Sequence, residues 1–251
     1  MKTIGIIGGM SWESTLLYYQ IINREVATRL GKLHSAKILL ESFNFQEIAN
    51  LQAQGEWPVL ARLLSDSARK LQIAGADCVL IATNTMHKIA DEVQASIRIP
   101  LLHIGDATAA AIQSQGQGLD SVGLLGTRFT MEQDFYRERL ERLNIHCLIP
   151  EQAQRDEMHR IIFEELCQGK CLPGSRLMVQ QMIRSLAERG AQGVILGCTE
   201  IPLLIGADDA CLPVFDTTRL HAMAAVDFIY TGYLPSMVFS ARPSVDLAMA
   251  H

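Results

Sequence analysis

The sequence predicts an α/β protein made of two pseudo-symmetric units, each with a parallel sheet, and a site in the cleft between them. Short apolar runs bounded by glycine alternate with helical segments of ten or more residues, which is typical of parallel sheets. Three pairs of segments also repeat in the same order at a similar spacing: 5–8 with 123–126, 75–85 with 190–200, and 99–103 with 212–216. Three repeats in one order indicate a duplicated topology.

The first half reads as alternating strands and helices. Residues 2–7 form an apolar run that ends at Gly8-Gly9, which predicts a buried strand. Ser11 is the expected N-cap of the next helix, and Gly31 is its expected C-terminal stop. The other expected elements are a strand at 36–42, loop and short helix at 44–55, a helix from Pro58, a strand at 78–82, a helix at 86–96 and a strand at 99–104.

The second half repeats this alternation. Thr130 with Gln133 resembles a capping box and predicts a helix that runs to about residue 143. Ser175 is expected to cap a later helix that stops before Gly190. The other expected elements are a helix at 106–115, a turn at 116–120, strands at 122–125 and 145–149, a helix at 151–168, strands at 194–196 and 212–216, and a helix at 218–230.

We expect the first unit to comprise residues 1–98 together with 209–230, because the last helix returns to it. The second unit is then 99–208. Residues 231–251 contain one glycine and two prolines without a clear period, and we interpret them as a tail.

The composition favours a small-molecule partner. The chain has 251 residues, 49% of them hydrophobic, and a net charge of −5, which argues against nucleic acid or an anionic membrane surface. No segment approaches the roughly 18 apolar residues of a membrane span, and the N-terminal apolar run is too short for a signal peptide. We therefore expect a cytoplasmic location, without a membrane partner.

The six cysteines do not form a metal-binding pattern. Cys167 and Cys171 have no second pair of His or Cys at zinc-ligand spacing, so we expect no metal. The scattered cysteines are interpreted as free thiols in a reducing compartment.

Polar residues gather where the two repeated strands end. In a parallel sheet, ligands bind at the carboxyl ends of the strands. The residues expected there are Thr83, Asn84 and Thr85 in the first copy, Cys198, Thr199 and Glu200 in the second, and Thr127 after another strand. Their hydroxyls and backbone N–H groups suit a carboxylate. Cys198 precedes a predicted helix, which should lower the pKa of its thiol and favour the reactive thiolate. A buried cysteine that only fills space is the competing interpretation.

No cofactor motif is present. The glycines near the N-terminus lack dinucleotide spacing, and no phosphate loop or nucleophile elbow occurs. No lysine lies in a context that indicates a Schiff base, so we expect no cofactor.

Several motifs resemble the aspartate/glutamate racemase family. They are GIIGGMSWEST at 5–15, TNTMHK at 83–88, MEQDFYRERL at 131–140, LGCTEIPLL at 196–204 and PVFDTT at 213–218. The resemblance covers about residues 1–230. It implies cofactor-independent racemisation of an acidic amino acid between two α/β units, in a homodimer. It also implies that two thiols flank the substrate Cα, with Cys198 serving the L-enantiomer.

The sequence departs from this family at two positions. Thr83 stands where the first thiol is usual, and a hydroxyl is a much poorer acid or base. A branch with threonine here is similar to L-aspartate/L-glutamate-specific or broad-spectrum racemases, and Met10 and Gln52 match its substrate-contacting positions. Cys167 stands where relatives often carry lysine, which affects substrate choice.

The mechanism that the resemblance implies starts with abstraction of the Cα proton by Cys198, and Thr83 or a water reprotonates the other face. Groups of Asn84, Thr85 and Thr199 are expected to bind one carboxylate of the substrate. Two alternatives remain open at this point. One is a single-cysteine relative that decarboxylates or isomerises a diacid, and the other is a non-catalytic amino-acid-binding protein.

Overall fold

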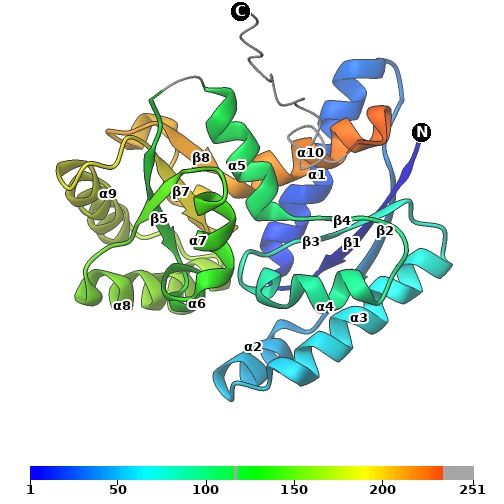
Figure 1. The fold of residues 1–251 in the computed structure, drawn as a ribbon, viewed down its shortest axis with the longest axis horizontal. Helices are drawn as coiled ribbons and strands as arrows, with labels where there is room; N and C mark the ends of the chain where they lie inside the picture. The colour runs from blue at the N-terminus through cyan, green and yellow to red at the C-terminus, as the bar shows by residue number, and fades with distance from the viewer. Residues whose placement is uncertain (116–117, 234–251) are drawn as a thin grey trace, which may run out of the picture.

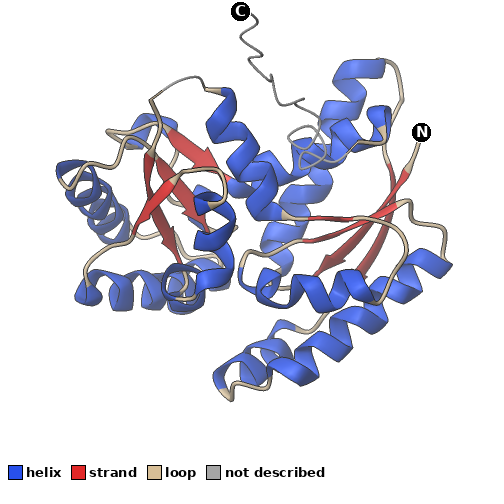
Figure 2. Ribbon diagram, viewed as in Figure 1, coloured by secondary structure: helices blue, strands red, loops and turns tan. Residues whose placement is uncertain are grey.

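Two four-stranded parallel sheets form the centre of the protein in the computed structural model, which describes residues 1–115 and 118–233 (Figures 1 and 2). The strand orders are β2-β1-β3-β4 and β6-β5-β7-β8, so the two sheets have the same topology. The predicted fold class is therefore confirmed. The strands are β1 Thr3–Gly8, β2 Lys37–Ser42, β3 Cys78–Ile81, β4 Leu101–Leu102, β5 Ser121–Gly126, β6 His146–Leu148, β7 Val194–Gly197 and β8 Val214–Asp216.

Helices cover both faces of the first sheet. Alternate side chains of a strand point to opposite faces. Ile4 and Ile6 of β1 accordingly share a core with Ile22 of α1, whereas Ile7 packs in a second core with Leu60 of α3. The helices of this half are α1 Trp12–Leu30, α2 Phe45–Ala53, α3 Trp57–Ile73, a 3₁₀ turn at Thr85–Ile89 and α4 Ala90–Ala95.

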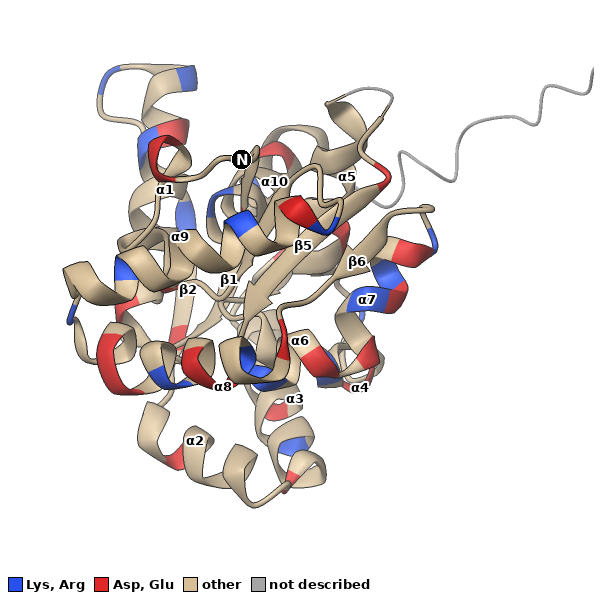
Figure 3. Cartoon of the chain, turned by 90° about the vertical axis from the view of Figure 1, so that its left-hand side faces the viewer, with Lys and Arg blue, Asp and Glu red and all other residues tan. Residues whose placement is uncertain are grey.

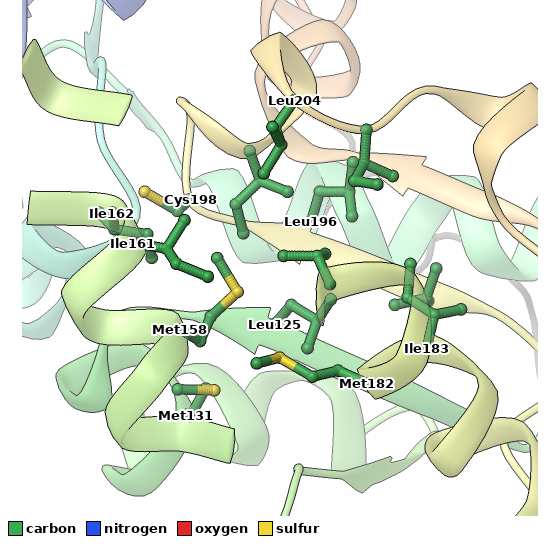
Figure 4. Packing of buried hydrophobic residues seen from close by; sticks show 14 of the residues in the cluster. Leu125, Met131, Met158, Ile161, Ile162, Met182, Ile183, Leu196, Cys198 and Leu204 are labelled. Atoms are coloured by element: carbon green, nitrogen blue, oxygen red, sulfur yellow. The ribbon is translucent and has the colours of Figure 1, made fainter. Parts of the chain in front are cut away.

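The second sheet is covered in the same way. Leu124 of β5 packs with Ile112 of α5 on one face, and Leu125 packs in the core that contains Met158 and Ile183 on the other (Figure 4). The helical elements are α5 Ile104–Ser114, α6 Arg128–Glu132, α7 Asp134–Glu141, α8 Gln152–Arg160, a π segment at Ile161–Glu165, 3₁₀ turns at Leu166–Gln168, Ile201–Leu203 and Ala207–Asp209, α9 Pro173–Glu188 and α10 Thr217–Thr231.

Sheet membership differs from the predicted unit boundaries. β4 pairs with β3 and completes the first sheet, although residues 99–208 were expected to form the second unit. β8 pairs with β7 and completes the second sheet, whereas α10, from the same predicted segment 209–230, packs in the core of the first sheet with Ile4 and Ile22. In each repeat the fourth strand forms hydrogen bonds with the otherwise unpaired edge of the third strand, so each sheet keeps all four strands of its own repeat. The predicted tail lies, from residue 234 on, outside the described residues.

Two predicted helix caps are wrong. Thr127, not Thr130, caps α6, because the chain turns at the end of β5 and the backbone N–H of Thr130 donates to the Thr127 hydroxyl. Leu172 precedes α9, which starts at Pro173 because proline presets the backbone angle of a first helical turn. Ser175 lies inside this helix and donates to Glu165 instead.

Three buried histidines pack edge to face where the two halves meet. The ring centroids of His87 and His103 are 4.4 Å apart, and those of His87 and His221 are 5.6 Å apart. Nε2 of His221 lies 2.9 Å from the Leu102 carbonyl oxygen, which can only accept, so Nε2 carries the proton. Nδ1 of His221 then accepts from the Tyr18 hydroxyl. Burial lowers the pKa of all three histidines, that of His221 to about 4, so they are neutral at pH 7.

These lowered pKa values predict a loss of stability in mild acid. Below the unfolded histidine pKa of about 6.5, the unfolded chain binds protons that the folded chain does not, so the free energy of unfolding falls. Urea unfolding at pH 7.5, 6.5 and 5.5 should show this decrease. His221→Gln should flatten it, and His34→Gln, which changes an exposed histidine, should not. Equal pH slopes for wild type and His221→Gln would contradict the assignment.

Candidate active site

A small cavity lies between the carboxyl ends of the two sheets. Its volume is about 20 Å³, which is room for about one water molecule. Nine of the ten site residues expected from the sequence line it: Met10, Gln52, Thr83, Asn84, Thr85, Thr127, Cys167, Cys198 and Glu200. Four further residues complete its wall: Phe45, Ile162, Phe163 and Gly197. The duplicated topology therefore brings the two repeat motifs to one place.

Cys198 and Thr83 approach this cavity from equivalent positions. Cys198 directly follows β7, and Thr83 is separated from β3 by a single residue. β3 and β7 occupy the same place in their sheets, next to β1 and β5. Both side chains line the same cavity, with 6% of Cys198 and 9% of Thr83 exposed. A molecule bound there would lie between a thiol from one half and a hydroxyl from the other.

Glu200 is the centre of the hydrogen bonding around Cys198. The Cys198 thiol donates to Oε2 of Glu200 at 3.0 Å, and the Thr199 hydroxyl donates to the same oxygen at 3.0 Å. Ser11, which follows β1 in the first half, donates to Oε1 at 2.6 Å. All three partners are donors, which suits an ionised carboxylate, an acceptor only. Ser11 and Glu200 thus join the two halves directly beside the thiol.

The predicted thiolate setting of Cys198 is wrong. Burial, followed by the charge of Glu200, raises the pKa of the Cys198 thiol well above its ordinary value. The element that directly follows β7 is a 3₁₀ turn at Ile201–Leu203 rather than an α-helix, so Cys198 does not lie at the N-terminus of an α-helix. Figure 4 shows Cys198 beside Ile161 and Ile162 at the margin of an apolar cluster, which explains its desolvation. The resting sulfur is therefore a protonated thiol in contact with a base.

Asn84 has a fixed orientation. Its Nδ2 lies 2.9 Å from the Thr217 hydroxyl oxygen, and that hydroxyl donates its own proton to the Leu196 carbonyl oxygen at 2.7 Å. The Thr217 hydroxyl oxygen must then accept from Nδ2, which fixes which of the two amide atoms is the nitrogen and which is Oδ1. Oδ1 is buried and has no hydrogen-bond partner among the described residues. An unpaired buried acceptor is costly, and it suits a ligand that donates.

Threonine hydroxyls from both halves form a second polar group. Oγ1 of Thr85 lies 3.0 Å from Oγ1 of Thr127 and 3.4 Å from that of Thr130. Thr199 is the one expected residue that does not line the cavity. Its side chain is buried against Glu200 instead, so it acts on the site through that carboxylate.

Two stacked phenylalanines form part of the cavity wall. The rings of Phe45, from α2, and Phe163, from the π segment, stack at 6.2 Å with 19° between their planes. Phe163 and Gln52 also line a wider neighbouring groove of about 600 Å³. An amino acid is far larger than the cavity, so its entry requires these side chains to move apart, and the groove is the adjoining space.

The family model for Asp/Glu/hydantoin racemases matches residues 7–225. The chain belongs to this family. A solved structure of a Yersinia pestis protein assigned to the Asp/Glu racemases is 53% identical to this family member, with a TM-score of 0.84 over 91% of this chain and 99% of that one. An aspartate racemase homologue from Pyrococcus horikoshii is 36% identical, with a TM-score of 0.78 and the same coverage.

Among curated proteins, glutamate racemases of Streptococcus pneumoniae are 32% identical over 131 residues. That match spans 50% of this racemase-family chain and 46% of theirs, so the chain covers less than half the length of those relatives.

Within residues 1–115 and 118–233, no three His, Cys, Asp or Glu side chains gather as a metal site would require. No helix in the described part of the chain is both long and apolar enough to cross a bilayer.

Sequence reasoning missed the residues that hold this site. Ser11 was interpreted only as a helix N-cap, but its hydroxyl makes no capping bond and binds Glu200. Thr217 fixes Asn84, and His87 binds the backbone carbonyl oxygen of Thr83 at 2.8 Å. The contact from Ser11 spans 189 positions and that from Thr217 spans 133, so neither has a local signal.

The Glu200 contact predicts a measurable change in thiol reactivity. Glu200→Gln removes the nearest negative charge, so the pKa of Cys198 should fall and its thiolate fraction should rise. The rate of Cys198 alkylation by iodoacetamide at pH 8, followed by peptide mass spectrometry, should therefore increase. Exposed Cys171 serves as the internal control in the same digest. Unchanged or slower alkylation of Cys198 would contradict the assignment.

Proposed function

We propose that this protein is a cofactor-independent racemase of an α-amino acid, in which Cys198 and Thr83 exchange a proton on opposite faces of Cα. The observation that carries the proposal is that both side chains line one cavity, in which a buried carboxylate accepts from the thiol. The names of the relatives make aspartate and glutamate the acidic substrates that the family suggests.

The cavity offers partners for both ends of a zwitterion. The unpaired Oδ1 of Asn84 is an acceptor for the α-ammonium group. The hydroxyls of Thr85 and Thr127, close to one another at the boundary of the two halves, are donors for the α-carboxylate. This assignment gives Asn84 the ammonium rather than the carboxylate. Donors on the carboxylate also stabilise the charge that develops when Cα loses its proton.

Glu200 supplies the base that activates Cys198. Its Oε2 is 3.0 Å from the sulfur, within reach for proton transfer. Moving the proton from the thiol to the carboxylate shifts one negative charge from oxygen to sulfur and buries no additional charge. The thiolate takes the Cα proton of the L-enantiomer.

Thr83 completes the reaction on the opposite face. Because a hydroxyl is a weak acid, we propose that Thr83 delivers the proton directly or through a water that it holds. The oxygen left without a proton then regains one from solvent while the protonated Glu200 releases its own, which restores the resting site. His87 positions Thr83 through its carbonyl oxygen. The two directions should differ in rate constants, with fast deprotonation of the L-form and slow handling of the D-form. The equilibrium between enantiomers is unaffected, since a catalyst does not change it.

We also propose that the protein acts as a homodimer in the cytoplasm, as the family resemblance suggests. An exposed apolar stripe on α1 supports the dimer. Trp12, Leu16 and Tyr19, spaced at one and two helical turns, are 61%, 46% and 51% exposed. Light scattering of the purified chain measures the oligomeric state directly.

The central test is hydrogen exchange at Cα in D₂O. L-amino acids incubated with the protein should lose their Cα–H signal and slowly form the D-enantiomer. Cys198→Ser should reduce exchange by about 10² to 10⁴-fold, because the general base is lost. Exchange that survives in this variant would remove Cys198 from the mechanism. A decarboxylated or isomerised diacid would instead support the single-cysteine alternative, and binding without exchange would support a sensor.

Replacing Thr83 tests the second face. Thr83→Cys introduces a thiol where the hydroxyl lies, so turnover of the D-enantiomer should rise by roughly tenfold or more. Chiral chromatography with D-substrate measures it. Thr85→Ser, which keeps a neighbouring hydroxyl, is the matched control and should give no such gain. No gain in Thr83→Cys would mean that residue 83 does not face Cα.

Asn84 should affect binding more than chemistry. Asn84→Ala removes the acceptor for the ammonium group, and KM should rise by roughly 10 to 100-fold, as expected for a hydrogen bond to a charged group. Thr217→Val frees the amide to rotate and should raise KM to a smaller extent. A fall in kcat with unchanged KM would assign Asn84 a different role.

A further inference from the structure

We propose that the preferred substrate of this site is an amino acid with an uncharged side chain, aliphatic or thioether, rather than an acidic one. The proposal rests on the proposed racemase function and specifies its substrate class. It follows from the charges and the apolar surface of the cavity wall.

The wall of the cavity is negative. Among its thirteen residues in the described part of the chain, Glu200 is the one that carries a charge, and none is Lys, Arg or His. Cys167 occupies the wall with an uncharged thiol, because burial raises its pKa. A distal carboxylate would therefore enter a buried space that already holds one negative charge and offers no cation.

The charge balance favours a neutral substrate. The α-ammonium and α-carboxylate of any amino acid cancel, so a substrate with an uncharged side chain leaves the cavity with the single charge of Glu200. Aspartate or glutamate adds a second negative charge. Burying a charge without a partner is strongly unfavourable. The three donors on Glu200 offset its own charge only, since each is already bonded to it.

The basic side chains close to the wall in sequence have partners outside it. Lys88 lies 4.0 Å from the centroid of the Trp57 ring, and Lys170 donates to Gln168. Arg128, in the neighbouring groove, lies 3.6 Å from Asp156. Arg160, just before the π segment, binds Glu157 and Glu165, each at 2.8 Å. His159 is neutral at pH 7, because burial lowers its pKa. β1 and β5 contain no Lys, Arg, Asp or Glu, whereas Figure 3 shows many charged residues on the surrounding helices.

The remaining wall suits an apolar side chain. Met10, Phe45, Ile162 and Phe163 line it together with Cys167. Two of these, the stacked phenylalanines, belong to the part of the wall that must move when a ligand enters. An aliphatic or thioether side chain would replace their mutual contact with contacts of the same kind, and it would lose little hydration. A carboxylate there would lose its hydration without gaining a partner.

The test compares substrates in one assay. Initial rates of Cα–H exchange in D₂O give kcat/KM for L-alanine, L-methionine, L-aspartate and L-glutamate at one pH and ionic strength. We expect the better neutral substrate to exceed both acidic ones by at least about tenfold. Cys167→Lys places a cation in the wall and should shift this ratio toward the acidic substrates by at least about tenfold.

Cys171→Lys is the matched control. It adds the same charge four residues away, at an exposed cysteine that does not line the cavity, and should leave the ratio unchanged. Thermal unfolding of each variant checks that it is folded, and the wild-type ratio tests the proposal even without the variants. Faster exchange of aspartate or glutamate by the wild type would overturn the substrate class and leave the racemase intact. Exchange of none of the four would instead overturn the proposed function itself.

Discussion

The hydrogen bond between the Cys198 thiol and the Glu200 carboxylate is the interaction on which the rest of the site depends. It places a base against the sulfur that follows β7. Burial raises the pKa of that sulfur, and the charge of the neighbouring carboxylate raises it further. Ser11 holds the other carboxylate oxygen from across the interface. The packing of the two halves and the protonation of the thiol are therefore linked through a single side chain.

Duplication explains why these groups meet. Both sheets place their third strand next to the first, so the loops after β3 and β7 emerge at equivalent positions. Glycines at the ends of β5 and β7 leave room for the two backbones to pair. A Cβ added at Gly126 would lie 2.8 Å from the Gly197 carbonyl oxygen. The loops face one another across the boundary, and the hydroxyls of Thr85 and Thr127 meet there. The architecture is thus nearly two-fold, and it closes over the site with one aromatic ring from each side.

The chemistry within this two-fold architecture is not symmetric. One face has a thiol with its own carboxylate, and the other has the Thr83 hydroxyl, whose backbone is fixed by a neutral histidine. A carbonyl oxygen only accepts, so Nδ1 of His87 donates to Thr83, and Nε2 of the same ring accepts from the backbone of Ile104. The histidines thereby support the position of the second face and remain uncharged. The two faces of the cavity therefore have similar geometry but side chains of unequal acidity.

The sequence by itself determined the fold class, the repeated strands and nine of the residues that line the cavity. It did so because strand periodicity and the polar residues after strand ends are local, and because parallel strands bring their carboxyl ends to one edge. Only the tertiary structure decided the protonation of Cys198, the orientation of Asn84 and the closure by Phe45 and Phe163. Each of these depends on burial or on partners far away in the chain: Ser11 for Glu200, and Thr217 for Asn84. The pKa of Cys198 and the orientation of the Asn84 amide depend on the atoms that surround these side chains in the folded protein. Residue spacing along the chain does not specify which atoms those are.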